Sequence, residues 1–428
     1  MASVPSTSFT RTTTVASTSK RAIYLATDAV TRALGDSLKS TKVGLAHVSV
    51  ATERSCALSI NEAADPSVRR DMLKALDVIT DGDADVASAL VGKTLSVPVL
   101  DGKLALGTWQ GVYLFELDDE GGERAMTVTL SAYGGDPRET GRRAALRAPG
   151  RGCHLVTDAP TVKAAPDKGV ATYFCQHTSA SLTINENCDP DVRVDLEGAL
   201  NKIVPESWHH EGFFEHVDEG PDDMAAHVKT TLIGSSIRVP VTRGRPCMGT
   251  WQGLYLNEHR NIGGFGRGHS RDVVCVIDPD EALMQKTITV SAGKRGLIDI
   301  TEDVAAVLAK ESRCDTGLLH CFCEHTSASV VVGRRGGEFE NKFERALNAI
   351  VPESWNVEFF RHTSEGPDDM PGHVKSTIVG AGLTLPVANG DIALGDDCRL
   401  YLCEHRTVGG FNSGLTRRLT VTLQGAKM

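Results

Sequence analysis

The chain has 428 residues, 41% of them hydrophobic and 23% charged, which is typical of a globular protein with roughly three domains. Its formal charge of −10 and the lack of a basic block argue against sequence-independent nucleic-acid binding. No stretch approaches about 18 consecutive apolar residues, which argues against a membrane span. The 11 cysteines include no Cys-x-x-Cys pair, which favours reduced thiols in an intracellular protein over disulfides or a structural zinc site.

The N-terminal residues allow two interpretations. Residues 1–21 are rich in Ser and Thr, contain basic but no acidic residues, and so resemble an organellar transit peptide. However, Lys20-Arg21 before Thr27-Asp28 corresponds to Lys294-Arg295 before Thr301-Glu302, so the segment from residue 11 resembles the first strand of a repeat. Only about ten residues then remain as a frayed tail, and we expect a cytoplasmic protein.

The last two thirds of the chain repeat block by block. His177-Thr178-Ser179-Ala180-Ser181 returns as His325-Thr326-Ser327-Ala328-Ser329, about 150 residues later. Three more blocks return at nearly the same offset, which is too regular for chance. They are Val204-Pro205-Glu206-Ser207-Trp208 with Val351-Pro352-Glu353-Ser354-Trp355, Glu219-Gly220-Pro221-Asp222-Asp223-Met224 with Glu365-Gly366-Pro367-Asp368-Asp369-Met370, and Glu258-His259-Arg260 with Glu404-His405-Arg406.

A third, more divergent copy precedes these two. Gly107-Thr108-Trp109-Gln110-Gly111 matches Gly249-Thr250-Trp251-Gln252-Gly253, and Ile60-Asn61-Glu62 matches Ile184-Asn185-Glu186. The chain therefore divides into three units over residues 11–132, 140–278 and 284–428, joined by polar linkers at 133–151 and 278–285.

The second unit shows the order of predicted elements that all three share. Residues 170–174 and 182–184 are apolar or β-branched and predict strands. A helix follows, because Asp189 can cap it with Pro190 at its first position. Asp222-Asp223 then begins a second helix, and residues 237–241, 254–256 and 273–277 predict strands, so each unit is α+β. One helix face recurs in each unit as Val192, Leu196, Leu200 and Ile203, as Val68, Met72, Leu76 and Ile79, and as Phe339, Phe343, Leu347 and Ile350.

These blocks resemble the YjbQ-like family, often labelled secondary thiamine-phosphate synthase. The family pattern is His-Thr-Ser-Ala, Asn-Glu-Asn before Asp-Pro, Glu-Gly-x-Asp-Asp-Met-x-x-His-x-Lys, Gly-Thr-Trp-Gln-Gly and Glu-His-Arg, and the second unit carries all of it. The resemblance implies small α+β units packed as a trimer about a threefold axis, so that three fused copies form a pseudo-trimer in one chain. It also implies an activity that joins a pyrimidine diphosphate to a thiazole phosphate and that can be secondary to another role.

The histidines within these motifs allow three interpretations. His177, His227 and His259 with a carboxylate would suit zinc or another divalent ion with an open coordination position. Alternatively, histidine, Lys229 and Arg260 would donate hydrogen bonds to a phosphate. In the structural interpretation, the histidines satisfy buried strand ends and Arg260 pairs with a surface acid. The corresponding candidates in the third unit are His325, His373, His405, Lys375 and Arg406.

The acidic and amide residues have structural and functional interpretations. Asn185 and Glu186 close a strand before a helix cap, where turn chemistry alone would explain them. Near the histidines, Glu186 would act as a general acid or base, with His177 and Asp223 as its catalytic partners and Asn185 as a substrate contact. Asp222-Asp223 would either begin a helix or hold Mg²⁺ against a diphosphate. The sequence shows no motif for a nucleotide cofactor.

The first and third units have each lost a different half of the motif set. The first unit keeps Asn61-Glu62 but has Glu53 and Asp85 where the first two histidines would stand. The third unit keeps its histidines but has Gly333-Arg334-Arg335 in place of Asn-Glu-Asn. Loss of this kind favours sites that combine the Asn-Glu half of one unit with the histidine half of its neighbour. If the Asn-Glu half of each unit pairs with the histidine half of the next unit, two sites are complete, and in the second His325, His373 and His405 face Asn185-Glu186. If it pairs with the histidine half of the preceding unit, only one site is complete.

These observations lead to one main functional expectation and one rival. We expect a monomeric transferase of the thiamine-phosphate-synthase type that acts on a small phosphorylated substrate, with a divalent ion, Zn²⁺ or Mg²⁺, as its candidate cofactor. The rival is a non-catalytic protein that binds a metal or a small anion. Neither expectation involves nucleic acid or a membrane.

Overall fold

The computed structural model of the protein describes residues 6–17, 21–53, 55–156, 165–261, 269–311, 314–407 and 415–427. Within these ranges each repeat contains one five-stranded and one three-stranded antiparallel sheet. Helices pack against the sheets, so the expected α+β class is confirmed. Among the described residues, no helix is both long and apolar enough to cross a membrane.

The five-stranded sheet has the same strand order in all three repeats. In chain order, the first and last strands of this sheet are hydrogen-bonded neighbours, and the last strand also pairs with the central strand. The strands, in sheet order, are β1 (Thr7–Ser17), β8 (Gly122–Ala132), β3 (Val43–Ser49), β5 (Thr94–Leu100) and β6 (Lys103–Leu104); β9 (Gly141–Ala148), β16 (His269–Ile277), β11 (Lys168–Cys175), β13 (Ser236–Thr242) and β14 (Arg245–Pro246); and β17 (Met284–Ala292), β24 (Leu415–Lys427), β19 (Cys314–Cys323), β21 (Gly382–Ala388) and β22 (Asp391–Ile392).

In the first two repeats, the recurring Asn-Glu block lies at the end of one outer strand of the three-stranded sheet. The three sheets are β2 (Ala22–Leu25), β7 (Gln110–Glu116) and β4 (Cys56–Glu62); β10 (Gly152–Leu155), β15 (Gln252–Glu258) and β12 (Ala180–Glu186); and β18 (Gly296–Asp299), β23 (Cys398–Glu404) and β20 (Ala328–Arg334).

The helices recur at equivalent positions. One follows the Asn-Glu strand, and a second carries the motif histidine or its replacement. The first set is α2 (Pro66–Ile79), α5 (Pro190–Ile203) and α9 (Gly337–Ile350), and the second is α3 (Ala84–Val91), α7 (Asp223–Ile233) and α11 (Asp369–Val379). The remaining helices are α1 (Thr27–Ser40), α4 (Pro137–Thr140), α6 (Ser207–His210), α8 (Thr301–Glu311) and α10 (Trp355–Glu358).

The capping prediction for α5 is confirmed. Asp189 accepts a hydrogen bond from the backbone N–H of Asp191, and Pro190 occupies the first turn, where its missing N–H costs nothing. In α9 the cap position is Gly336, whose φ of 112° suits glycine, and no side chain caps the helix. The sequence period therefore locates both helices, although only one has the capping chemistry.

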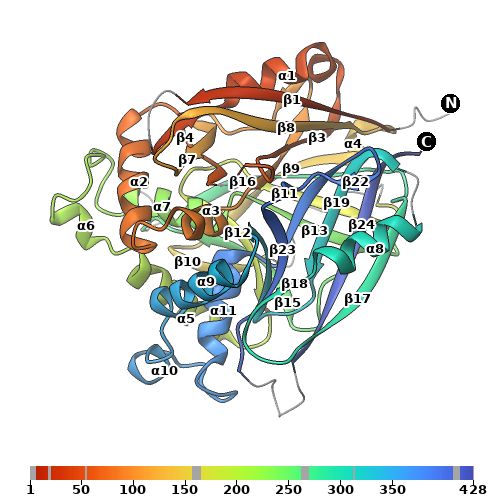
Figure 1. The fold of residues 1–428 in the computed structure, drawn as a ribbon. Coiled ribbons are helices and arrows are strands. Elements are labelled where there is room, and N and C mark those ends of the chain that lie inside the picture. Colours follow the sequence, from red (N-terminus) through yellow and green to blue (C-terminus); the bar gives the residue numbers. More distant parts are fainter. Residues whose placement is uncertain are drawn as a thin grey trace.

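The three repeats close around a common pseudo-threefold axis. The equivalent strands β5, β13 and β21 contact one another, as do the equivalent helices α3, α7 and α11. A single apolar cluster includes Leu76, Leu200 and Leu347, one from each repeat. Figure 1 shows α2, α5 and α9, with α3, α7 and α11, gathered on one side, whereas α1 and α8 lie with the long sheet strands on the other. The chain is therefore a pseudo-trimer that buries its repeat interfaces internally.

Two boundaries differ from the sequence expectation. The predicted linker 133–151 contains α4 and strand β9, which pairs with β16 at the edge of its sheet. Its arginines hide the strand pattern, because charged residues are common on edge strands, where they discourage pairing with other chains. Strand β1 begins at Thr7, four residues earlier than expected. The 11 cysteines are free thiols, and Cys321 and Cys323 are both buried in β19.

Candidate metal centres between repeats

Asparagine side chains fasten the first two repeats to their neighbours. Asn185, in β12, donates through Nδ2 to the main-chain carbonyl of His373 at 2.8 Å and to Thr377 Oγ1 at 2.7 Å, both in α11. Asn61, in β4, makes the same two bonds to α7. Each buried amide thus ties a strand of one repeat to a helix of the next and brings the following glutamate to that helix.

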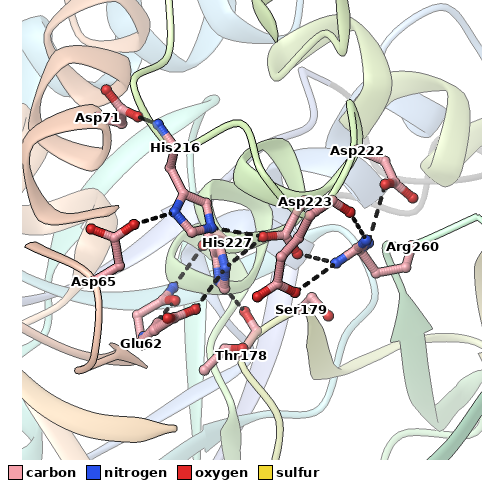
Figure 2. A network of polar contacts seen from close by, with 12 residues as sticks. Glu62, Asp65, Asp71, Thr178, Ser179, His216, Asp222, Asp223, His227 and Arg260 are labelled. Carbon is pink, nitrogen blue, oxygen red and sulfur yellow. Dashed lines mark hydrogen bonds and ion pairs between the residues drawn. The ribbon is translucent and has the colours of Figure 1, made fainter. Parts of the chain in front are cut away.

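A cluster of histidines and carboxylates lies at the first of these interfaces (Figure 2). Glu62 Oε2 comes from repeat one and lies 3.3 Å from Nε2 of His227 in repeat two. The same Nε2 is 3.3 Å from Asp223 Oδ2, which is 2.9 Å from His216 Nε2. Asp65 Oδ2, again from repeat one, is 2.7 Å from His216 Nδ1. This first cluster therefore needs both repeats.

The outer nitrogens of the two rings are held by oxygen atoms. His227 Nδ1 is 3.1 Å from the Thr178 carbonyl, so Nδ1 is the donor and Nε2 faces the cluster. His227 Nε2 is buried and faces the carboxylates of Glu62 and Asp223. Hydrogen bonding to Asp223 raises the pKa of His216 to about 9. Burial tends to lower the pKa of His227, but the carboxylates of Asp223 and Glu62 outweigh burial and raise this pKa above its usual value. The carboxylates of this cluster therefore favour positive charge at its centre.

The second interface repeats this arrangement between repeats two and three. Glu186 Oε2 lies 3.4 Å from His373 Nε2, which is 3.6 Å from Asp369 Oδ2. His362 Nε2 is 2.9 Å from Asp369 Oδ2, and its Nδ1 is 2.6 Å from Asp189 Oδ2. This second cluster matches the ring direction that the loss of motif halves favours for two shared sites.

The third interface has neither histidine nor asparagine at these positions. Arg334 of β20 replaces the glutamate, Asp85 of α3 replaces the helix histidine, and Arg334 Nη1 lies 3.4 Å from Asp85 Oδ2. Gly333 replaces the asparagine, and a Cβ atom there would lie 2.1 Å from the Phe339 ring. The charges are reversed and the space is filled, so a third cluster of the same kind cannot form.

Arginine side chains hold the aspartate pairs. Arg260 Nε lies 3.1 Å from Asp222 Oδ1, and its Nη1 pairs with Asp223 Oδ1. Arg406 holds Asp368 and Asp369 in the same way. Burial would raise the pKa of Asp223, but hydrogen bonds from His216 and His227 and the charge of Arg260 hold it well below its usual range. The aspartate Oδ2 atoms are therefore presented to the clusters as carboxylates.

A family comparison accounts for the threefold repetition. The sequence model described as "UPF0047 protein YjbQ-like" matches residues 11–133, 144–278 and 286–426. The chain belongs to the YjbQ-like family. The UPF0047 protein YjbQ of Escherichia coli O157:H7 is 47% identical over 126 residues, covering 28% of this chain and 88% of the relative. The UPF0047 protein YugU of Bacillus subtilis is 43% identical over 90 residues, covering 21% and 64% respectively.

Solved YjbQ-like structures also correspond to one repeat each. A Clostridium acetobutylicum protein, described as uncharacterized and of the YjbQ/UPF0047 family, is 31% identical with a TM-score of 0.26, and the match covers 32% of this chain and 98% of that protein. A Sulfolobus solfataricus protein, described as YbjQ-like and of unknown function, is 21% identical with a TM-score of 0.28, and the match covers 33% and 97%.

The first motif histidine of each YjbQ-like repeat lies outside the clusters. His177 Nε2 is 2.7 Å from Nη1 of Arg271, and arginine can only donate, so this nitrogen accepts a hydrogen bond. Burial and the Arg271 charge lower the pKa of His177 to about 3, and burial and Arg417 do the same for His325. The prediction that these two residues are metal ligands is therefore wrong for this geometry; both rings remain partly exposed.

The Glu-His-Arg histidines and the motif lysines lie in the interior of their own repeats. His259 Nε2 is 2.9 Å from Ser181 Oγ, and His405 Nε2 is 2.8 Å from Ser329 Oγ. Lys229 Nζ donates to Asn201 Oδ1 at 2.6 Å, and burial lowers its pKa to about 7. His259 and His405 are therefore not cluster ligands, because the strand end directs them into the repeat interior.

The predicted phosphate contacts are also corrected by the structure. Lys229 and Lys375 are 0% and 1% exposed, so neither amine reaches a substrate. Arg260 and Arg406 are occupied by the aspartate pairs, and the amide nitrogen of Asn185 is occupied by α11. Of the residues predicted to bind substrate, only His325 is partly exposed and still has a polar atom that is not occupied by another residue in this way.

Two cluster histidines escape the motif analysis. His216 and His362 stand in Phe213-Phe214-Glu215-His216 and Phe359-Phe360-Arg361-His362, at the same repeat offset and six residues before the aspartate pair. That recurrence is a sequence signal that could have found them. Asp189 was expected only as a helix cap, and both it and its counterpart Asp65 contact a histidine of the next repeat.

Proposed function

We propose that each of the two clusters binds one divalent transition-metal ion, with Zn²⁺ as the best fit. In the first cluster the ligands would be Nε2 of His216 and His227 and carboxylate oxygens of Glu62 and Asp223. In the second they would be the corresponding atoms of His362, His373, Glu186 and Asp369. The supporting observation is that histidine and carboxylate atoms from two repeats converge, with the buried His227 Nε2 facing Glu62 and Asp223.

The donor set favours zinc over magnesium. Imidazole nitrogen with carboxylate oxygen is a common zinc ligand set, whereas Mg²⁺ prefers oxygen ligands alone. The pair formed by Asp65 and His216 also fits, because ligating histidines usually donate their other N–H to a carboxylate or carbonyl. A bound ion would replace the protons that the raised histidine pKa values retain at the metal-free site.

The reaction that we propose is transfer chemistry on a small phosphorylated molecule, of the thiamine-phosphate-synthase type. A divalent ion supplies Lewis-acid polarisation of a phosphoryl oxygen. The chain itself supplies orientation: Asp65 and Asp189 orient the histidine rings, and Arg260 and Arg406 hold the aspartates. Glu62 and Glu186 are each 12% exposed, so these proposed ligands lie at the edge of each cluster that a substrate could approach.

Elemental analysis of the purified chain tests the metal proposal. We expect two metal equivalents per chain, one in His227→Ala, one in His373→Ala and none in the double variant. His177→Ala and Arg334→Ala are matched controls, because His177 lies outside the clusters and Arg334 lies at the third interface, and both should keep two. Equal metal loss in His177→Ala and His227→Ala would contradict the assignment.

Turnover tests the reaction separately. The metal-loaded chain is mixed with the pyrimidine diphosphate and thiazole phosphate precursors of thiamine phosphate, and the joined product is measured. We expect product from the wild type and a loss of at least a hundredfold in the His227→Ala, His373→Ala double variant. Two bound metals with no product would favour a non-catalytic metal-binding protein instead.

A further inference from the structure

A cavity of about 160 Å³ lies where the three repeats meet, and no cluster histidine or carboxylate lines it. Ser96, Arg238 and Thr384 occupy the same position of the equivalent strands β5, β13 and β21, so the cavity lies on the pseudo-threefold axis. Among the described residues that line it, the ionisable side chains are His47, Lys93, Arg238 and His320, and no Asp or Glu is present. This axial cavity therefore has cations and hydrogen-bond donors without a carboxylate.

Arg238 is a buried cation bonded only to neutral groups. The residue is 5% exposed, and its guanidinium donates to Thr172 Oγ1 at 3.2 Å, Thr384 Oγ1 at 2.9 Å and Gln424 Oε1 at 2.8 Å. Within the described residues, no carboxylate forms an ion pair with it; Asp278 is near enough to act on its charge but accepts its hydrogen bond from Ser6. Burial lowers the pKa of Arg238 to about 10, so the group stays charged at neutral pH. An unpaired buried charge is unfavourable, and a bound counter-ion would relieve that cost.

Two histidines add donors beside this guanidinium. His320 Nδ1 lies 3.0 Å from Thr384 Oγ1 and His47 Nδ1 lies 2.9 Å from Ser96 Oγ. The Thr384 hydroxyl accepts from Arg238 and has its own proton to donate to His320 Nδ1; in that tautomer the ring proton is on Nε2. Both Nε2 atoms are buried and make no hydrogen bond of normal geometry among the described residues, although main-chain carbonyls lie near the rings, that of Thr384 beside His47 and those of Leu383 and Arg238 beside His320.

Neither ring supplies charge of its own. Burial and the Arg238 charge lower the pKa of His47 to about 3 and that of His320 well below its usual range. Each ring is therefore neutral at pH 7, with one N–H to donate. The Nε2 amide of Gln424, whose oxygen accepts from Arg238, is a further buried donor without a partner.

We propose that the axial cavity binds a small inorganic anion of single charge, with chloride as the probe, held by the Arg238 guanidinium and the Nε2–H groups of His47 and His320. Lys93 donates to the main-chain carbonyls of Glu53 and Cys56, so the Arg238 guanidinium, surrounded by neutral N–H donors, matches one negative charge. The volume also accommodates a chloride ion with water. The site is independent of the metal clusters and would join residues from all three repeats.

Thermal unfolding of the full chain tests this proposal. Chloride replaces gluconate at constant ionic strength, and the Tm of the wild type should rise with chloride concentration and then saturate. Arg238→Thr should lose this dependence; threonine is the matched choice because repeats one and three have Ser96 and Thr384 at this position. His227→Ala, outside the cavity, should keep it. An equal chloride response in Arg238→Thr, or a response to phosphate but not to chloride, would overturn the proposal.

Direct detection keeps the test valid if Arg238→Thr fails to fold. Crystals of the wild-type chain soaked in bromide should give an anomalous-scattering peak within hydrogen-bond distance of Arg238. Bromide has the charge of chloride and is similar in size, so the same donors would hold it. Crystals with bromide bound elsewhere but no peak beside Arg238 would contradict the anion site.

Discussion

Three histidines of the second repeat differ in what their ring nitrogens contact. His227 points Nε2 at two carboxylates, His177 accepts a hydrogen bond from Arg271, and His259 contacts Ser181 inside its own repeat. The same side chain is therefore a candidate ligand, a neutral acceptor or a core residue, depending on its neighbours. Motif membership alone does not distinguish these roles.

Asp65 should tune metal affinity through His216. In a His373→Ala background, where only the first cluster is intact, Asp65→Asn should weaken metal binding about 10- to 100-fold, because the carboxylate orients the ring and raises its basicity. Metal titration of the refolded, metal-free protein measures the change. Asp189→Asn in the same background is the control, since it touches only the disabled cluster. Equal weakening by both variants would indicate a general effect on folding.

Asp278 should make stability depend on pH. Its carboxyl accepts from Ser6 Oγ at 2.6 Å, and burial raises its pKa to about 6. The folded state therefore binds this proton more tightly than the unfolded state does, and the resulting stabilisation is complete below about pH 4 and lost as pH rises through about 6. Relative to the wild type, Asp278→Asn should gain up to about 3 kcal/mol of unfolding free energy between pH 4 and pH 7. Urea denaturation at both pH values measures these unfolding free energies. If the difference between the variant and the wild type were the same at pH 4 and pH 7, the raised pKa of Asp278 would be contradicted.

At the scale of elements, each cluster forms because a strand of one repeat ends against a helix of the next. Strands β4 and β12 end at α7 and α11, with the asparagine bonds fixing their register. Strand β20 ends against α3 in the same manner, but the Arg334–Asp85 pair replaces the cluster there. One packing arrangement thus supports two candidate sites and one salt bridge.

Asn185→Leu should weaken this junction. Leucine has a similar size but cannot donate to the His373 carbonyl or Thr377, so the cost should be about 1–3 kcal/mol of unfolding free energy. Chemical denaturation measures it, and metal analysis should show loss of the second equivalent only. Asn61→Leu is the mirror experiment and should remove the first equivalent. Loss of both equivalents from either single variant would contradict independent interfaces.

At the scale of the whole molecule, the fusion replaces the subunit contacts of a trimer. The apolar cluster shared by Leu76, Leu200 and Leu347 already closes the ring. We therefore expect a monomer, and light scattering after size exclusion should give the chain mass of 45.7 kDa. A stable mass near three chains would show that the internal ring does not satisfy the interfaces.

Local patterns in the sequence determined much of the architecture. Block repetition predicts three units, the period of apolar residues predicts α2, α5 and α9, and Asp189 with Pro190 predicts where α5 begins. The separate loss of the Asn-Glu and histidine halves even indicates the ring direction that the Glu186–His373 contact now shows. These features are visible because each depends on residues close together in the chain or on an exact repeat of a block.

Only the tertiary structure decided which polar groups meet. Asp65 and His216 are about 150 residues apart in the chain, and nothing local states that a helix cap would also hold a histidine of the next repeat. The engagement of Arg260 with the aspartates, the burial of Lys229 and the convergence of His47, Arg238 and His320 on the axis are decided in the same way. Repeat closure sets these contacts, because distances between side chains depend on how whole sheets and helices pack rather than on local propensity.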